Sequence, residues 1–179
     1  NSHKTVLELS NLDKIFGWYI QTLEKLQASG KRPEVNEIVI NSAKELYTEK
    51  KAEVLQYEAG DDLEAGMPEG EGNLDYGNIL SAVKKYNEAC KLSKTTDAQK
   101  KNLARIGKES LKKYKLKEAI MQYGLAGNKP SEVLEKLSWE FMGWALDAFI
   151  KSDDKTVDKW FGHYDVTEKL LKHFKEAAK

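Results

Sequence analysis

The chain has few side chains suited to catalysis or metal binding. It contains three histidines and one cysteine, at His3, His163, His173 and Cys90. A di-iron helical bundle needs Glu-x-x-His pairs, and the sequence contains none. One cysteine and three scattered histidines also match no known zinc-binding spacing. We therefore predict no metal, no cofactor and no catalytic residue.

His163 is the histidine with the best case as a general base. It lies in the turn-like sequence "GHYD", where a histidine more often bonds to backbone groups than transfers protons. The sequence has no nucleophile elbow, P-loop or dinucleotide-binding glycine motif. A helical-bundle enzyme that uses carboxylates or His163 is the less favoured alternative to a non-enzymatic protein.

Residues 58–75, "EAGDDLEAGMPEGEGNLD", hold seven carboxylates and no basic side chain. The glycines and Pro68 predict a long, flexible acidic loop between the second and third helices. The loop does not match a calcium-binding EF-hand, because the twelfth position counted from Asp61 is Gly72 instead of a bidentate glutamate. We expect no metal in this loop.

The formal net charge of zero hides three blocks of different charge. Residues 1–83 hold 8 basic and 15 acidic side chains, a net charge of −7. Residues 84–118 hold 12 and 4, a net charge of +8, and residues 119–179 hold 9 and 10, a net charge of −1. Such a basic block indicates an anionic partner or, in the simplest interpretation, a solvated basic helix face.

Within the basic block, five residues recur at steps of four and three: Lys101, Arg105, Lys108, Lys112 and Lys115. At about 100° and about 1.5 Å per residue they share an arc of about 80° on one helix over about 21 Å. We call these five residues the basic stripe. Its length suits several phosphates of a nucleic-acid backbone. The candidate stacking groups beside it are Tyr86, Tyr114 and Tyr123.

Apolar periodicity predicts an all-α bundle of five to seven helices in a single domain, residues 1–179. The predicted helices cover residues 6–28, 33–60, 74–92, 97–126 and 131–150, and a last helical segment is interrupted near Gly162. Gly30 is expected to end the first helix. The fifth helix is apolar all round, so we expect it at the centre of the bundle. The four tryptophans, Trp18, Trp139, Trp144 and Trp160, are expected mainly in the core.

These features predict an interaction module or complex subunit that binds a macromolecular partner through charged helix faces. The first hypothesis is nucleic-acid backbone binding by the basic stripe, with the acidic loop as an internal mask. The second is a protein-binding adaptor that uses the loop or the stripe. The fifth helix could also bury one side in a homo-oligomer. No apolar run is long enough to span a membrane, and a lone cysteine favours an intracellular, cytoplasmic protein.

Overall fold

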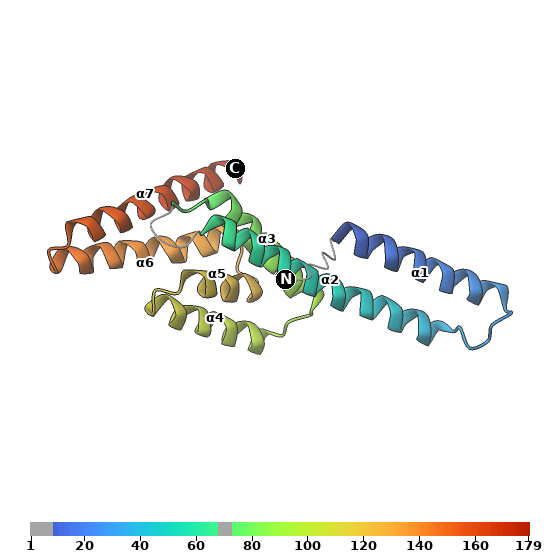
Figure 1. Ribbon diagram of the computed structural model, residues 1–179. Helices are drawn as coiled ribbons and strands as arrows, with labels where there is room; N and C mark the ends of the chain where they lie inside the picture. The colour runs from blue at the N-terminus through green and yellow to red at the C-terminus, as the bar shows by residue number, and fades with distance from the viewer. Residues whose placement is uncertain (1–8, 68–72) are drawn as a thin grey trace, which may run out of the picture. The chain divides into compact units, whose positions relative to one another are not determined.

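The computed structural model describes residues 9–67 and 73–179 of the chain. The regular elements in these two ranges are all helices (Figure 1): α1 (Leu9–Ser29), α2 (Glu37–Gly66), α3 (Tyr76–Leu92), α4 (Asp97–Lys112), α5 (Leu116–Leu125), α6 (Pro130–Ile150) and α7 (Asp154–Ala177). The predicted all-α class is therefore confirmed for the described ranges, and seven helices fall within the expected number. None of these helices is long and apolar enough to cross a bilayer.

The chain forms two compact units, residues 1–96 and residues 97–179. The first contains α1 to α3, and the second contains α4 to α7. The first unit has 12 basic and 16 acidic side chains, a net charge of −4, whereas the second has 17 and 13, a net charge of +4. The first unit is therefore net acidic, and the second unit is net basic. The prediction of a single domain stays a prediction.

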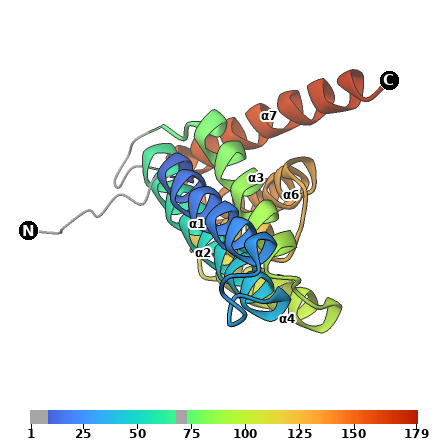
Figure 2. The same cartoon turned by 90° about the vertical axis from the view of Figure 1, so that its right-hand side faces the viewer.

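In the first unit, α1 packs along the first half of α2, and α3 packs along its second half (Figure 1, Figure 2). The rings of Phe16 and Tyr47 lie 5.4 Å apart, and Lys44 Nζ lies 3.5 Å from Glu24 Oε1. Gly30 ends α1 with a φ of 67°, as predicted. The small core between α1 and α2 consists of Leu23, Ile40 and Ala43, with Ile20 and Val35 packed against it.

The predicted acidic loop is wrong for residues 58–66, which form the last turns of α2. Ion pairs with α3 hold this segment, because Asp62 Oδ2 accepts hydrogen bonds of 2.8 Å from both Ser81 Oγ and Lys85 Nζ. Glu58 lies 3.8 Å from the same lysine. At the far end of the segment, Asp75 caps α3 by accepting a bond from the Asn78 backbone N–H. Residues 68–72 lie outside the described residues.

In the second unit, α4 pairs with α5 and α6 pairs with α7, while α5 also contacts α6. The predicted fourth helix over residues 97–126 is two helices, α4 and α5. Tyr114 adopts a left-handed φ of 58°, and the Lys115 N–H reaches the Ser110 carbonyl at 2.9 Å. These features form a Schellman cap, which normally uses glycine. The sequence offered no glycine at this position, so the break was not predicted.

The expected place of the fifth helix at the centre of the bundle is also wrong. One face of α6 is buried, through Val133, Leu134, Leu137, Phe141, Trp144, Ala145 and Ala148. The other face is exposed, at Trp139, Leu146, Phe149 and Ile150. A helix of this unit has too few neighbours to cover both faces. The core interpretation of the tryptophans holds for Trp144 but fails for Trp18 and Trp139, which are largely exposed.

The last helical segment is continuous, contrary to the predicted interruption. Gly162 lies inside α7, and a Cβ atom at this position would meet no atom within 4 Å. Asp153 begins α7 by accepting a hydrogen bond from the Thr156 backbone N–H. With this strong start and an apolar face packed on α6, a single glycine is insufficient to break the helix.

Candidate functional site

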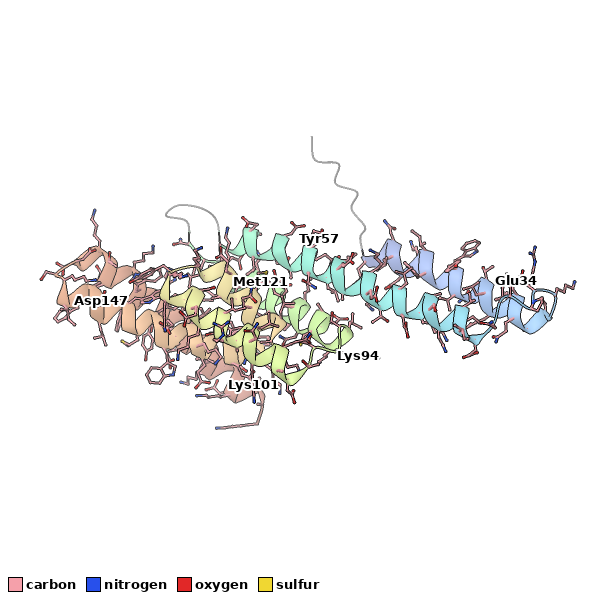
Figure 3. All side chains as sticks on the ribbon, turned by 90° about the horizontal axis from the view of Figure 1, so that it is seen from below. Glu34, Tyr57, Lys94, Lys101, Met121 and Asp147 are labelled. Carbon is pink, nitrogen blue, oxygen red and sulfur yellow. The ribbon has the colours of Figure 1, made fainter. Side chains whose placement is uncertain are left out.

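Four of the five basic-stripe residues lie along α4, and all five are exposed. The buried positions of α4 are Gly107 and Leu111, which lie away from the lysines on the helix circumference. Figure 3 shows Lys101 on this helix. Packing of α4 through its small apolar face therefore leaves the cationic side chains of the stripe in solvent.

Lys115 departs from the predicted geometry. It follows the Tyr114 cap and stands at the N-terminal end of α5, so it is not part of the α4 surface. The part of the stripe on one helix, from Lys101 to Lys112, spans about 16 Å at about 1.5 Å per residue. The regular helical spacing that predicted the stripe therefore holds for four residues and fails at the fifth.

The stripe is only partly neutralised by its neighbours. Lys112 Nζ lies 3.3 Å from Glu109 Oε1, and Arg105 Nη2 donates a 3.0 Å bond to the Asn102 side chain. Within the described ranges, Lys101 and Lys108 have no ion-pair partner. An exposed pair such as Lys112 with Glu109 is weak and yields readily to a stronger anion. The surface is therefore able to accept several anionic groups.

Burial corrects the prediction for two of the three tyrosines. Tyr86 is 3% exposed and Tyr123 is 5% exposed, so neither ring has a face on which a base could stack. Burial raises the pKa of Tyr86 to about 12, with a further contribution from the Asp62 charge. Tyr123 packs so closely on Gly107 that a Cβ atom there would lie 3.2 Å from its ring.

Tyr114 is the accessible tyrosine of the three, at 57% exposed. Its ring centroid lies 4.7 Å from that of Trp144, with the ring planes tilted by 40°. The left-handed backbone at this residue places the ring beside the end of α4. One face is thus occupied by Trp144, and the rest of the ring is open beside the C-terminal end of the stripe.

His163 lies in an aromatic cluster between α6 and α7. Its ring centroid is 5.5 Å from that of Phe141 and 5.9 Å from that of Trp160. Burial holds the pKa of His163 below its usual value, and the charge of Lys159 lowers it further. The ring is therefore neutral at pH 7. In the described part of the chain, no three His, Cys, Asp or Glu side chains are grouped as metal ligands.

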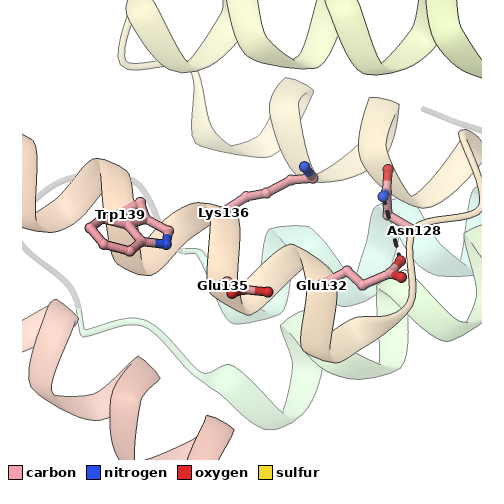
Figure 4. A pocket seen from close by; sticks show the side chains of 5 residues that line it. All are labelled: Asn128, Glu132, Glu135, Lys136 and Trp139. Carbon is pink, nitrogen blue, oxygen red and sulfur yellow. Dashed lines mark hydrogen bonds between the residues drawn. The ribbon is translucent and has the colours of Figure 1, made fainter.

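A shallow hollow of about 330 Å³ lies beside the first half of α6 (Figure 4). Its lining residues are Asn128, Glu132, Glu135, Lys136 and Trp139. Glu132 is engaged at the start of the helix, where it accepts a 2.7 Å bond from the Lys129 backbone N–H. Lys136 Nζ sits 5.2 Å from the centroid of the Tyr123 ring. Glu132 thus stabilises the start of α6, and Lys136 packs against α5.

Sequence reasoning missed the exposed apolar residues of α1 and α6, including Trp18 and Trp139. Their helical spacing was the available signal, but the same spacing also describes a buried face. In comparisons with known proteins, no family model, no curated protein and no solved structure matches the chain. The fold and the site therefore define a class only, an all-α protein with a cationic helix surface.

Proposed function

We propose that the protein is a non-enzymatic interaction module that binds nucleic-acid backbone through the basic stripe. The observation that carries the proposal is the exposure of four cationic side chains on one side of α4. Lysines predominate in the stripe, and lysine is suited to phosphate contact without base selection. Binding should therefore be independent of sequence.

Salt dependence gives the proposal a quantitative form. If the four α4 residues each neutralise one phosphate, log K should fall with log salt with a slope of about −3.6. Between about 50 and 200 mM salt this slope corresponds to an affinity loss of about 150-fold. Fluorescence anisotropy with a labelled DNA duplex measures both quantities.

The test variant is Lys101→Glu with Lys108→Glu, because neither lysine has an ion pair to lose within the described ranges. We expect at least a tenfold loss of affinity at low salt and a slope reduced by about 2. The matched control is Lys172→Glu with Lys175→Glu on α7, which makes the same charge change at exposed positions of the same unit. Equal losses in the two variants would refute the stripe as the binding surface.

The second candidate is an acidic protein surface that binds the same stripe. It rests on the same exposed cationic side chains, because lysine and arginine form charge-assisted hydrogen bonds with carboxylates as well as with phosphates. A stoichiometric protein partner that stays bound after nuclease treatment, together with weak duplex binding, would favour this candidate. Masking of the stripe by the acidic segment stays a prediction. Its test is Asp61→Asn with Glu69→Gln and Glu71→Gln, which should strengthen binding at low salt.

A further inference from the structure

The arm formed by α1 and residues 37–50 of α2 exposes more large apolar side chains than it buries. Its buried apolar residues are Leu12, Leu23, Ile40 and Ala43. Its exposed large apolar residues are Ile15, Trp18, Tyr19, Leu26, Ile38, Val39 and Leu46. A helix normally buries its apolar face against another element, and two helices alone provide one interface. The arm therefore lacks a packing partner for one of its sides.

Five of the seven exposed large apolar residues lie on one side of the arm. The ion pair between Glu24 and Lys44 marks the polar side. At 100° per residue in two antiparallel helices, Ile15, Tyr19 and Leu26 of α1 turn to the opposite side. The same geometry turns Val39 and Leu46 of α2 to that side. We call these five residues the apolar side of the arm.

The two edges of the apolar side carry opposite charges. Lys14 and Lys25 follow the outer edge of α1, and Glu45 and Glu49 follow the outer edge of α2. All four side chains are exposed, and they have no ion-pair partner among the residues that the structure describes. One edge is thus basic and the other is acidic, which is the pattern of a surface that complements itself after a half turn.

We propose that a second copy of this chain covers the apolar side, so that two arms form an antiparallel four-helix bundle. A two-fold axis parallel to the helices places α1 of each copy over α2 of the other. Every helix then has antiparallel neighbours, as in ordinary four-helix bundles. The alternative two-fold axis, perpendicular to the helices, stacks α1 on α1 and brings like charges together.

The register within the arm specifies the cross-copy contacts. Phe16 lies beside Tyr47, so Lys14, two residues earlier, is level with Glu49, two residues later in the antiparallel helix. In the proposed dimer, Lys14 of each copy therefore faces Glu49 of the other. The two-fold symmetry makes this contact twice. By the same register, Leu46 is level with Gly17 and lies between Ile15 and Tyr19 along the arm.

Light scattering coupled to size-exclusion chromatography tests the proposal on the full chain. We expect twice the chain mass of 20.3 kDa, with dissociation on dilution across about 1 to 100 µM. Leu46→Glu places a charge in the apolar side and should give a monomer with unchanged helix content. Leu146→Glu is the matched control, because it makes the same change on the exposed face of α6 in the second unit and should leave the dimer intact.

Charge reversal tests the orientation of the two copies. Lys14→Glu alone or Glu49→Lys alone should weaken the dimer about tenfold, since two symmetric contacts become repulsive. The two changes together should restore it. A chain that is monomeric at all concentrations overturns the proposal and assigns the apolar side to a different protein. A dimer that survives Leu46→Glu, or that the double reversal fails to restore, overturns it as well.

Discussion

Two glycines within the acidic residues 58–75 should respond in opposite ways to substitution by alanine: one substitution should raise the free energy of unfolding, and the other should lower it. Gly60 lies inside α2, and a Cβ atom there would meet nothing within 4 Å. Gly60→Ala should therefore stabilise the protein by about 0.5 to 1 kcal/mol, because alanine is the better helix former. In a flexible loop, the same change would have little effect.

Gly66 is in the opposite situation, because the start of α3 packs against it. A Cβ atom at Gly66 would lie 3.0 Å from the Asp75 carbonyl oxygen and 3.1 Å from both Asn78 Cβ and Ile79 Cγ1. The Asp75 backbone N–H also donates a 2.8 Å bond to the Gly66 carbonyl, so this contact cannot relax freely. Overpacking of this kind costs about 1 to 3 kcal/mol. The two variants should thus differ by about 1.5 to 4 kcal/mol.

Urea unfolding followed by helix circular dichroism measures both free energies, and hydrogen exchange of residues 58–66 localises the effect. The dependence on denaturant should be unchanged in both variants, because neither alters the surface exposed on unfolding. A Gly66→Ala variant as stable as the parent chain, or a destabilised Gly60→Ala variant, would contradict these expectations. Either result would mean that this segment is not helical or not packed on α3.

Two further predictions concern the second unit. Ser152 follows α6 with a left-handed φ of 55° and is exposed, so Ser152→Gly should raise the free energy of unfolding by about 1 kcal/mol, measured by urea titration. The pKa of His163 is lowered in the folded state, so the unfolded chain binds more protons below its own pKa of about 6.5. Stability should therefore fall as the pH falls from 7.5 to 5. His163→Phe should reduce this slope, and an unchanged slope would contradict the burial of the neutral ring.

Several helix boundaries could be read from the sequence because they depend on nearby residues. Gly30 ends α1, and α4 begins at Asp97, as the local signals predicted. The break between α4 and α5 at Tyr114 has no such signal, and it was missed. Lys94, Tyr114 and Ser152 all adopt left-handed backbone conformations after helices, and none is glycine. At each of the three, the backbone N–H of the next residue bonds back to a carbonyl of the preceding helix, so a local cap forms without a glycine at a modest conformational cost.

The candidate site was predictable only in part, for a similar reason. The basic stripe follows from the spacing of charged residues along one helix, and four of its members lie together on α4. The split at Tyr114 removes Lys115 from that surface. Tyr86 and Tyr123 could not be distinguished from exposed tyrosines, because burial depends on residues far away in the sequence, such as Gly107 beside Tyr123.

The sequence by itself determined the helical class, the charge of each segment and the alignment of the stripe. These properties arise from neighbours three and four residues apart, and a single helix realises them. Only the tertiary structure decided which apolar faces are buried, that residues 58–66 are helical, and that α1 and α6 leave apolar side chains in solvent. Helical periodicity is identical on a buried face and on an exposed one, so the difference depends on which elements pack against each helix.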